Sequence, residues 1–259
     1  MNVTIILPLH KYSEEYDEML KTSAGSINYT GKDKEVALIV VARKADYEKY
    51  KNLNKKSVTL VEIGEEETTN FQHMVNKGVE AVKTEYFAVL EVDDLFTEKA
   101  FVNFEKYANS EYRASIMPFL SEAVDYSVKD KGSIGYINEA AWANGFSEEI
   151  GTIDSNSIMD FFSFNLTGAI INKEDFLSVG GLKESIKISF WYEFLLRALK
   201  YGKNTFVIPK VGYIHMINRP DSLADEYSKT ISSDEAEWWI DLAKKEYFYK
   251  EDRNKTYEE

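Results

Sequence analysis

The sequence predicts an α/β fold in which helices flank a mostly parallel central sheet. Two observations on the N-terminal part carry this prediction. Short β-prone segments alternate with helical ones, and the segments 35–42, after its first residue Glu35, and 86–90 are apolar throughout, as in strands covered on both faces. Strands of this kind that are joined by helices need crossover connections and run parallel, which is the pattern of a nucleotide-binding half-domain.

The order of elements follows from local patterns. The first helix, for example, carries Tyr16, Met19 and Leu20 on one side. The expected strands are residues 3–7 (ended by Pro8), 35–42, 57–63, 86–90 and 114–120, and the expected helices are residues 13–23, 46–52, a segment after Thr68, and 97–109.

Residues 121–157 show no clean period and contain scattered glycines, which predicts a long loop or a hairpin insertion. A lid or binding loop and a plain surface excursion are both open interpretations of this segment. Regular patterns then return. We expect a strand at 164–172, a short helix from Lys173, a turn at Gly180 and Gly181, an amphipathic helix over 188–201 that ends at Gly202, and strands at 205–208 and 212–215.

The C-terminal segment reads as an amphipathic helix. Ser232 and Glu235 form a capping box, and the helix carries an apolar stripe of Trp238, Trp239, Leu242 and Tyr249. We therefore expect a main domain over residues 1–225 and a helix and tail over 226–259. The stripe is expected to dock on the domain or on a second subunit, so a homo-oligomer through this helix is an open hypothesis.

Composition excludes several classes of protein. The chain has 259 residues, with 31 Lys and Arg against 44 Asp and Glu, a net charge of −13 and a pI near 4.9, which disfavours nucleic-acid binding. It has no cysteine, which excludes disulfides and suits a reducing compartment, and we expect a cytoplasmic protein. The first ten residues read as a strand and not as a signal peptide, and no apolar run is long enough to span a membrane.

The most informative segment is the acidic one after the strand 86–90, which reads Glu91, Val92, Asp93, Asp94. Ligands of open α/β sheets bind outside the carboxyl ends of the strands, so these carboxylates are placed to hold a cation and, through it, a phosphate. Three carboxylates this close repel one another unless a cation or solvent screens them. The alternative is an acidic turn in which Asp94 is the N-cap of the next helix.

Other motifs argue against competing chemistries. The chain contains neither a phosphate-binding GxxxxGK[ST] loop nor a GxGxxG turn, which argues against kinases, NTPases and dinucleotide enzymes. Its three histidines, His10, His73 and His215, do not have the spacing of a hydrolytic zinc site. His10 follows the first strand and is a candidate to touch a nucleotide, whereas His73 is expected to be structural.

Three stretches in the right order resemble family 2 glycosyltransferases of the GT-A fold, over about residues 1–223. TIILPLHKYSE is similar to the family's opening strand and nucleotide loop, and VNKGVEAVKTEYFAVLEVDD is similar to its Asn-x-Gly helix and the strand that ends in a DxD-like motif. LTGAIINKEDFLSVGGLKES is similar to the acceptor-side segment.

The resemblance implies transfer of a sugar from a nucleotide-diphosphate donor, a UDP-sugar as first choice, to a hydroxyl of a glycan, a protein or a small molecule. It implies Mn²⁺ or Mg²⁺ as cofactor. The metal ligands would be Glu91, Asp93 and His215, although His215 is also compatible with a partly buried polar residue at a strand end. The residues expected at the nucleotide are Pro8, His10, Arg43, Asn76 and Val92.

The chain departs from the family pattern at two places. Ala42, Arg43 and Lys44 stand where the family has an acidic residue for the base or ribose. Phe190 and Trp191 stand where inverting members have a Glu-Asp pair that includes the catalytic base.

The candidates for the catalytic base are Glu193 and Glu184. A helical step turns about 100°, so Glu193 faces about 200° away from Trp191. Its alternative roles are to face solvent or to pair with Arg197.

Two hypotheses from different classes remain. The first is a metal-dependent glycosyltransferase. The second is a GT-A-like domain without turnover that binds a sugar or a protein, which the missing Glu-Asp pair and Ala42 keep open. A nucleotidyltransferase is a remote third reading, because residues 10–18 lack the Gly-rich basic loop that such enzymes carry after their first strand.

Overall fold

The computed structural model describes residues 2–10, 13–29, 36–50, 58–127, 132–138, 151–159, 161, 164–220 and 222–248. The strands are β1 Val3–Leu9, β2 Ala37–Ala42, β3 Val58–Glu62, β4 Tyr86–Val89, β5 Leu95–Phe96, β6 Ile116–Met117, β7 Phe119–Asp125, β8 Ser133–Ile137, β9 Thr152–Ile153, β10 Ile170–Asn172, β11 Thr205–Phe206 and β12 Ile208–Ile217. The helices are α1 Asp17–Ser26, α2 Lys44–Tyr50, α3 Phe71–Ala81, α4 Ala100–Ala108, α5 Ser155–Met159, α6 Lys173–Ser178, α7 Phe190–Lys200, α8 Leu223–Thr230 and α9 Ser233–Phe248, with short 3₁₀ turns at Glu14–Tyr16 and Ile27–Tyr29.

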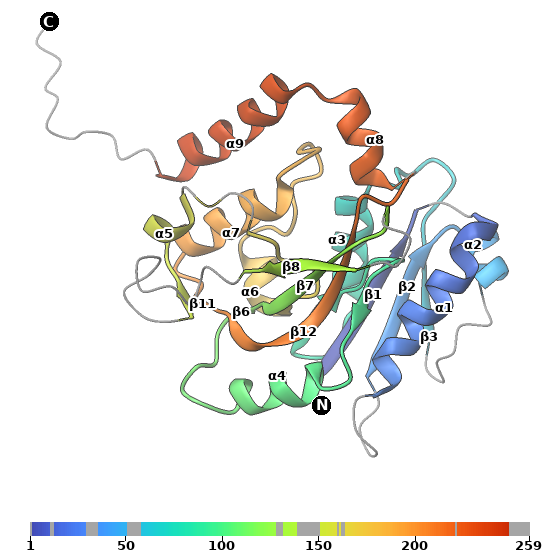
Figure 1. Ribbon diagram of the computed structural model, residues 1–259, viewed down its shortest axis with the longest axis horizontal. Helices are drawn as coiled ribbons and strands as arrows, with labels where there is room; N and C mark the ends of the chain where they lie inside the picture. Colours follow the sequence, from blue (N-terminus) through green and yellow to red (C-terminus); the bar gives the residue numbers. More distant parts are fainter. Residues whose placement is uncertain are drawn as a thin grey trace, which may run out of the picture.

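The described strands form two sheets (Figure 1). The larger one has the order β3-β2-β1-β4-β10-β6-β11-β9, and the smaller one has the order β5-β12-β7-β8. Strands β3, β2, β1 and β4 are parallel, which confirms the prediction for the N-terminal half. Strand β10 is antiparallel to both β4 and β6, which the sequence pattern did not predict.

The parallel strands are buried on both faces, as their apolar sequences predicted. On β1, Ile5 packs in the layer that contains Leu20 of α1, and the next residue, Ile6, packs in the layer that contains Met74 and Val75 of α3. Alternate side chains of a strand point to opposite faces, so a strand between two helical layers has no polar face.

Strand β1 continues through Pro8, where the sequence predicted its end. The amide of Leu90 donates to the carbonyl of Ile6, so Ile6 directs its backbone groups toward β4. Two residues later Pro8 faces the same side, but the pairing with β4 has ended at Ile6. The missing N–H of proline therefore leaves no ladder partner unsatisfied.

Gly78 lets α3 pack closely on the sheet. A Cβ at this position would lie 2.6 Å from Cγ2 of Ile6 and 3.0 Å from Cγ2 of Val41. We expect Gly78→Ala to lower the free energy of unfolding by about 1–3 kcal/mol through overpacking, despite the better helix propensity of alanine. Chemical denaturation measures this, and Gly25→Ala on α1, where no atom lies within 4 Å of the added Cβ, is the matched control. Equal stability of both variants would contradict the overpacking.

Part of the segment 121–157 is a hairpin, which the sequence predicted as the alternative to a long loop. Strand β7 pairs antiparallel with β8, and β7 also pairs parallel with β12. Residues 128–131 and 139–150 of this segment lie outside the described residues.

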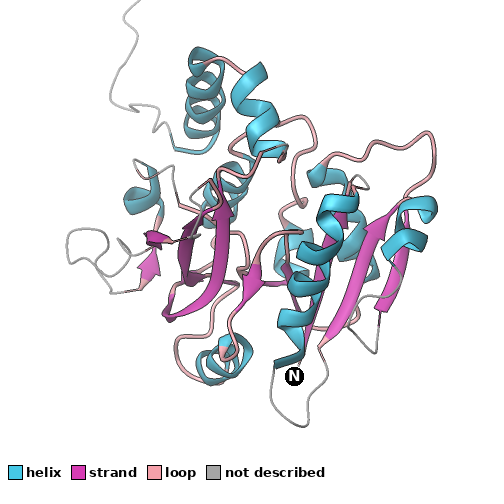
Figure 2. Cartoon of the chain, turned by 45° about the vertical axis from the view of Figure 1, so that its right-hand side comes forward, coloured by secondary structure: helices cyan, strands magenta, loops and turns pink. Residues whose placement is uncertain are grey.

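The C-terminal segment contains two helices where the sequence predicted one. Ser222 caps α8 by accepting a hydrogen bond from the amide of Asp225 at 3.0 Å. Ser232 accepts from the amide of Glu235 at 3.2 Å, which confirms the predicted cap of α9. Figure 2 shows α8 and α9 together, on the side of the sheets away from the N-terminus.

The docked face of α9 differs from the predicted stripe. Ala243 is buried, and Ile240 and Tyr247 pack on the core, whereas Trp238 and Leu242 are exposed. Tyr249 lies outside the described residues. The described part of the chain contains no helix that is both long and apolar enough to cross a membrane.

Candidate active site

The acidic segment after β4 is fixed at the sheet edge by hydrogen bonds to α1 and by the strand pairing of β5. Ser23 of α1 donates to the carbonyl of Glu91 at 2.8 Å, and Ser26 accepts from the amide of Phe96 at 3.1 Å. Strand β5 pairs antiparallel with β12, with Leu95 opposite Ile214. This pairing brings His215 of β12 next to the acidic segment, although the two are more than a hundred residues apart in the chain.

Three side chains form what we call the acidic cluster: Glu91, Asp94 and His215. Their potential ligand atoms all lie within 4.8 Å of one another. The carboxylate of Asp94 is buried, lies 2.9 Å from Nδ1 of His215 and accepts the amide of Met216 at 2.8 Å. The alternative role for Asp94 as a helix cap is wrong, because Lys99 is the N-cap of the next helix, α4.

Glu91 is held by the turn that precedes β10 and by β12. The hydroxyl of Thr167 donates to Oε1 of Glu91 at 3.2 Å, and the amide of Glu91 donates to the hydroxyl of Tyr213 at 3.3 Å. Gly168 has a φ of +72°, and a Cβ there would lie 2.2 Å from the Tyr213 ring. A glycine is therefore required beside the threonine that orients Glu91.

The acidic cluster strongly perturbs its own ionisation. Burial raises the pKa of Glu91 to about 8, and the negative charge of Asp94 acts in the same direction. Burial alone would lower the pKa of His215, but the carboxylates of Asp94 and Glu91 raise it to about 9. The protons on Glu91 and His215 relieve the repulsion between the carboxylates of the acidic cluster. A bound cation can replace these protons, so the cluster has the electrostatics of a cation site.

Asp93 points to a different partner. Its carboxylate lies 2.5 Å from Nε of Arg219, and both side chains are 8% exposed. The guanidinium also lies over the ring of Tyr16, 4.8 Å from its centroid. Nη1 of Arg219 is buried and has no hydrogen-bond partner among the described residues. The sequence predicted Glu91, Asp93 and His215 as metal ligands. In the structure, the group that could hold a metal ion is Glu91, Asp94 and His215.

A pocket of about 240 Å³, which we call the acidic pocket, opens at this point. Six of the residues predicted for the donor or the metal line it: Pro8, His10, Glu91, Val92, Asp93 and His215. Arg219 lines it as well, so the sheet edge brings the acidic cluster and a buried guanidinium to one cavity.

Two residues predicted at the nucleotide do not line this pocket. The amide side chain of Asn76 bridges both backbone groups of Leu182, donating to its carbonyl at 2.8 Å and accepting from its N–H at 2.9 Å. Arg43 donates to the carbonyls of Glu65 and Glu67, each at 3.4 Å. Both side chains hold loops through hydrogen bonds to backbone groups, and this structural role accounts for the two residues without a ligand.

The two base candidates are also held elsewhere. Glu193 is 1% exposed and forms a two-point ion pair with Arg197, at 2.9 Å to Nε and 2.8 Å to Nη2, which confirms the pairing alternative and contradicts the solvent-facing one. Tyr247 of α9 donates to the same carboxylate at 2.7 Å. Glu184 lies 3.0 Å from Nδ1 of His73. Neither Glu193 nor Glu184 lines the pockets described around the acidic cluster.

A second pocket, the aromatic pocket, adjoins the acidic one and has a volume of about 440 Å³. Phe190 and Trp191, which occupy the positions of the family's Glu-Asp pair, both line it. The two pockets share five lining residues: Phe71, Glu91, His215, Leu223 and Ala224. The two pockets therefore adjoin along a common wall.

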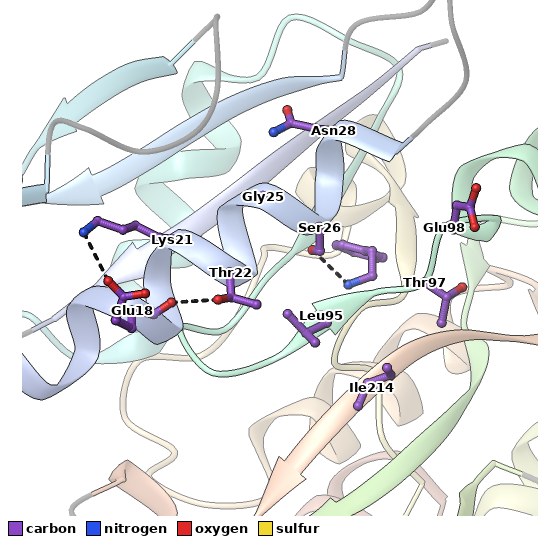
Figure 3. Close-up of a pocket in the computed structure, with 11 residues that line it drawn as sticks. Glu18, Lys21, Thr22, Gly25, Ser26, Asn28, Leu95, Thr97, Glu98 and Ile214 are labelled. Carbon is purple, nitrogen blue, oxygen red and sulfur yellow. Dashed lines mark hydrogen bonds and ion pairs between the residues drawn. The ribbon is translucent and has the colours of Figure 1, made fainter.

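A wider pocket of about 830 Å³ lies between α1 and β5 (Figure 3). Its walls include Lys21, Thr22 and Glu98. Lys21 is already paired with Asp17 and Glu18, and Ser26 is bonded to Phe96, so these polar groups stabilise the walls. No acidic and histidine cluster lies in the described part of this pocket, and we do not assign the active site to it.

The acidic cluster fits a divalent cation by its donor set. Two carboxylates and one imidazole, within reach of a common point, are ligands that Mn²⁺ accepts, with an anionic ligand and water filling the other positions. The unpaired Nη1 of Arg219 beside the cluster suits an anionic oxygen at the same place.

Comparison with known proteins agrees with this fold. The model of the family described as glycosyltransferase like family 2 matches residues 2–257, so the chain belongs to that family. Its fold is that of the GT-A glycosyltransferases, as the resemblance predicted. No curated protein has a sequence that matches the chain significantly.

The similar solved structures are remote in sequence. TarS 1–349 of S. aureus in complex with UDP-GlcNAc superposes with a TM-score of 0.61 at 15% identity, over 86% of this chain and 61% of that one. The same fragment without a named ligand gives 0.60 at 13% identity, over 93% and 78%. The mannosyltransferase PcManGT from Pyrobaculum calidifontis in complex with GDP-Man and Mn²⁺ gives 0.57 at 14% identity, over 85% and 58%. The chain thus spans about three fifths of the first TarS fragment.

The sequence did not reveal two residues of the site, Arg219 and Thr167. Arg219 follows His215 by four positions, and Thr167 precedes the glycine of the segment 166–171. Both residues can be seen in the sequence, but their place in the site depends on which strand lies beside the acidic segment.

Proposed function

We propose that this protein is a metal-dependent glycosyltransferase that moves a sugar from a nucleotide-diphosphate donor to an acceptor hydroxyl. The acidic cluster carries the proposal, because Glu91, Asp94 and His215 offer three ligand atoms within 4.8 Å beside a pocket that Arg219 lines. TarS was solved with UDP-GlcNAc and PcManGT with GDP-Man and Mn²⁺, which supports a nucleotide-sugar donor for this chain.

Several residues at the acidic pocket have a definable task in this reaction. Glu91, Asp94 and His215 would hold the ion, and Arg219 would donate to a phosphate oxygen through Nη1. A bound divalent cation supplies Lewis-acid stabilisation of the negative charge on a departing diphosphate. Pro8 and Val92 form apolar wall of the same pocket and help to exclude water from it.

A donor titration tests the proposal. We expect UDP or GDP with Mn²⁺ to raise the Tm of the protein by about 5 °C or more at roughly 100 times the Kd, because the ligand binds only the folded state. Thermal unfolding with each nucleotide diphosphate, with and without Mn²⁺, measures this shift. The controls are Mn²⁺ alone, the nucleoside without phosphate, and EDTA, which should remove the shift.

One specific observation favours a second function. Phe190 and Trp191 cannot accept a proton, and they occupy the place of the Glu-Asp pair. A GT-A-like module that binds a sugar or a protein without turnover is therefore the alternative. Binding of a nucleotide sugar with no consumption of it, in the presence of candidate acceptors, would support the module, and donor-dependent product would exclude it.

A further inference from the structure

The aromatic pocket has a strongly graded chemistry. Two of the five residues shared with the acidic pocket, Glu91 and His215, are polar, and Thr167 is hydrogen-bonded to Glu91 at the same end. Most of the other lining residues are apolar or aromatic, which are Phe71, Ile188, Phe190, Trp191, Leu223, Ala224, Tyr227, Ile231 and Ala236. A ligand that fills this pocket must therefore be polar at one end and apolar along its body.

The rings of the pocket form a connected wall. The centroid of Phe71 lies 5.4 Å from that of Phe190 and 6.3 Å from that of Trp191. These spacings are those of packed aromatic pairs, so the wall is rigid and presents ring faces and edges to the cavity. At about 440 Å³, the pocket has the volume of a small-molecule site.

The polar side chains that grip a sugar ring are sparse in this pocket. Recognition of several vicinal hydroxyls requires several fixed hydrogen-bonding partners, and unpaired hydroxyls in an apolar site are costly. Among the described residues that line the aromatic pocket there is no Asn, Gln, Asp or Arg. Outside the polar end, the polar lining groups are the side chains of Lys187, Ser189 and Ser228, the hydroxyl of Tyr227 and the buried indole N–H of Trp191.

We propose that the aromatic pocket binds the acceptor, and that the acceptor is a hydroxyl compound with an apolar, aryl or alkyl body. This inference rests on the proposed function, because it places the hydroxyl at Glu91 and His215, next to the donor. The replacement of the Glu-Asp pair by Phe190 and Trp191 then gives the pocket its preference for an apolar body over a glycan.

Helix α8 offers variants that close the pocket without touching the acidic cluster. Ser228 is exposed and lines the aromatic pocket but not the acidic one. Ser228→Trp would fill the cavity, and Ser228→Glu would place a charge in it. Glu226, on the same helix, is exposed and lines neither of these two pockets, so Glu226→Trp is the matched control.

The test measures binding of 2-naphthol, as a probe with one hydroxyl and an aromatic body, and of N-acetylglucosamine, as a sugar probe. Calorimetry or saturation-transfer NMR is done on the full chain, with and without UDP and Mn²⁺. We expect 2-naphthol to bind the wild type and Glu226→Trp alike, and both Ser228 variants to bind it at least about tenfold more weakly. Nucleotide binding should be the same in all four proteins, which also shows that the variants are folded.

The outcomes separate this inference from the proposed function. Unchanged 2-naphthol binding in both Ser228 variants would overturn the location, and Ser228-sensitive binding of N-acetylglucosamine in preference to 2-naphthol would overturn the acceptor class. Loss of the probe with retention of nucleotide binding supports the inference. Binding of 2-naphthol by a protein that binds no nucleotide would overturn the acceptor role together with the proposed function.

Discussion

Replacing Asp94 with asparagine is expected to abolish Mn²⁺-dependent nucleotide binding and to lower any transfer rate by about 100-fold or more. The amide keeps the shape of the side chain and can still accept the amide of Met216, but it removes one negative charge from the acidic cluster. A neutral ligand binds a hard cation poorly, and the ion supplies several kcal/mol of charge stabilisation in such reactions. Calorimetry with UDP or GDP and Mn²⁺ measures the effect.

Asp93→Asn is the matched comparison. Asp93 is paired with Arg219 and lies outside the acidic cluster, so this variant should keep metal binding and alter the nucleotide affinity through the freed guanidinium. The Tm of each variant without ligand shows whether it is folded. If Asp93→Asn loses the Mn²⁺ response and Asp94→Asn keeps it, Asp94 is not a metal ligand and the first expectation from the sequence, with Asp93 in that role, is restored.

The second large effect concerns stability. Glu193→Gln is expected to lower the free energy of unfolding by about 3–5 kcal/mol, because it leaves the buried guanidinium of Arg197 without its counter-ion. For a chain of this size the Tm should fall by roughly 6–20 °C. Lys183, 3.2 Å from the same carboxylate, loses a partner as well. Thermal and chemical unfolding measure the loss.

The same variant decides between two roles for Glu193. A structural role predicts that the folded fraction of Glu193→Gln keeps its turnover number, whereas a catalytic base predicts a large loss at temperatures where the variant is folded. Tyr247→Phe is the control, since it removes one hydrogen bond to Glu193 and keeps the charge, and it should cost about 1 kcal/mol. A large activity loss at full folding would make Glu193 a catalytic residue again.

The stability effect of Glu193 should depend on pH in a defined direction. Burial raises the pKa of this carboxyl, but hydrogen bonds from Arg197 and Tyr247 and the charges of Arg197 and Lys183 outweigh it, and the pKa is lowered from 4.5. A carboxyl whose pKa is lower in the folded state stabilises the fold at pH values above 4.5 and loses this effect as the pH falls below it. The difference between wild type and Glu193→Gln should therefore be full at neutral pH and shrink in acid.

The sequence predicted the parallel half of the fold because its strands are buried on two faces. Such strands are apolar at every position, so β1, β2 and β4 stood out without any knowledge of their neighbours. The second sheet was harder, because β5 has two residues and β12 is irregular where it pairs with β7. Short strands with shifted register have no period to detect.

The position of the candidate site could be predicted from the sequence, but the full set of residues that form its cluster could not. The acidic segment at the end of β4 could be located from the sequence, since carboxyl ends of parallel strands are where ligands bind. Which of the adjacent residues Asp93 and Asp94 faces the cluster depends on the pairing of β5 with β12, a contact across the chain. The pairing of Glu193 with Arg197 was within reach of the sequence, but its second partner was not, because Tyr247 lies on a helix that follows it by more than fifty residues.

The pairing of Asp93 with Arg219 also has a consequence for the order of events at this sheet edge. It neutralises one acid, and at pH values above the pKa of Glu91, which is about 8, the charges of both Glu91 and Asp94 face an incoming ligand. A free pyrophosphate would meet repulsion there, whereas the same group carrying its counter-ion would not. The metal and the nucleotide should accordingly bind as one complex, or the metal should bind first. Inhibitors that lack phosphates would not meet this repulsion.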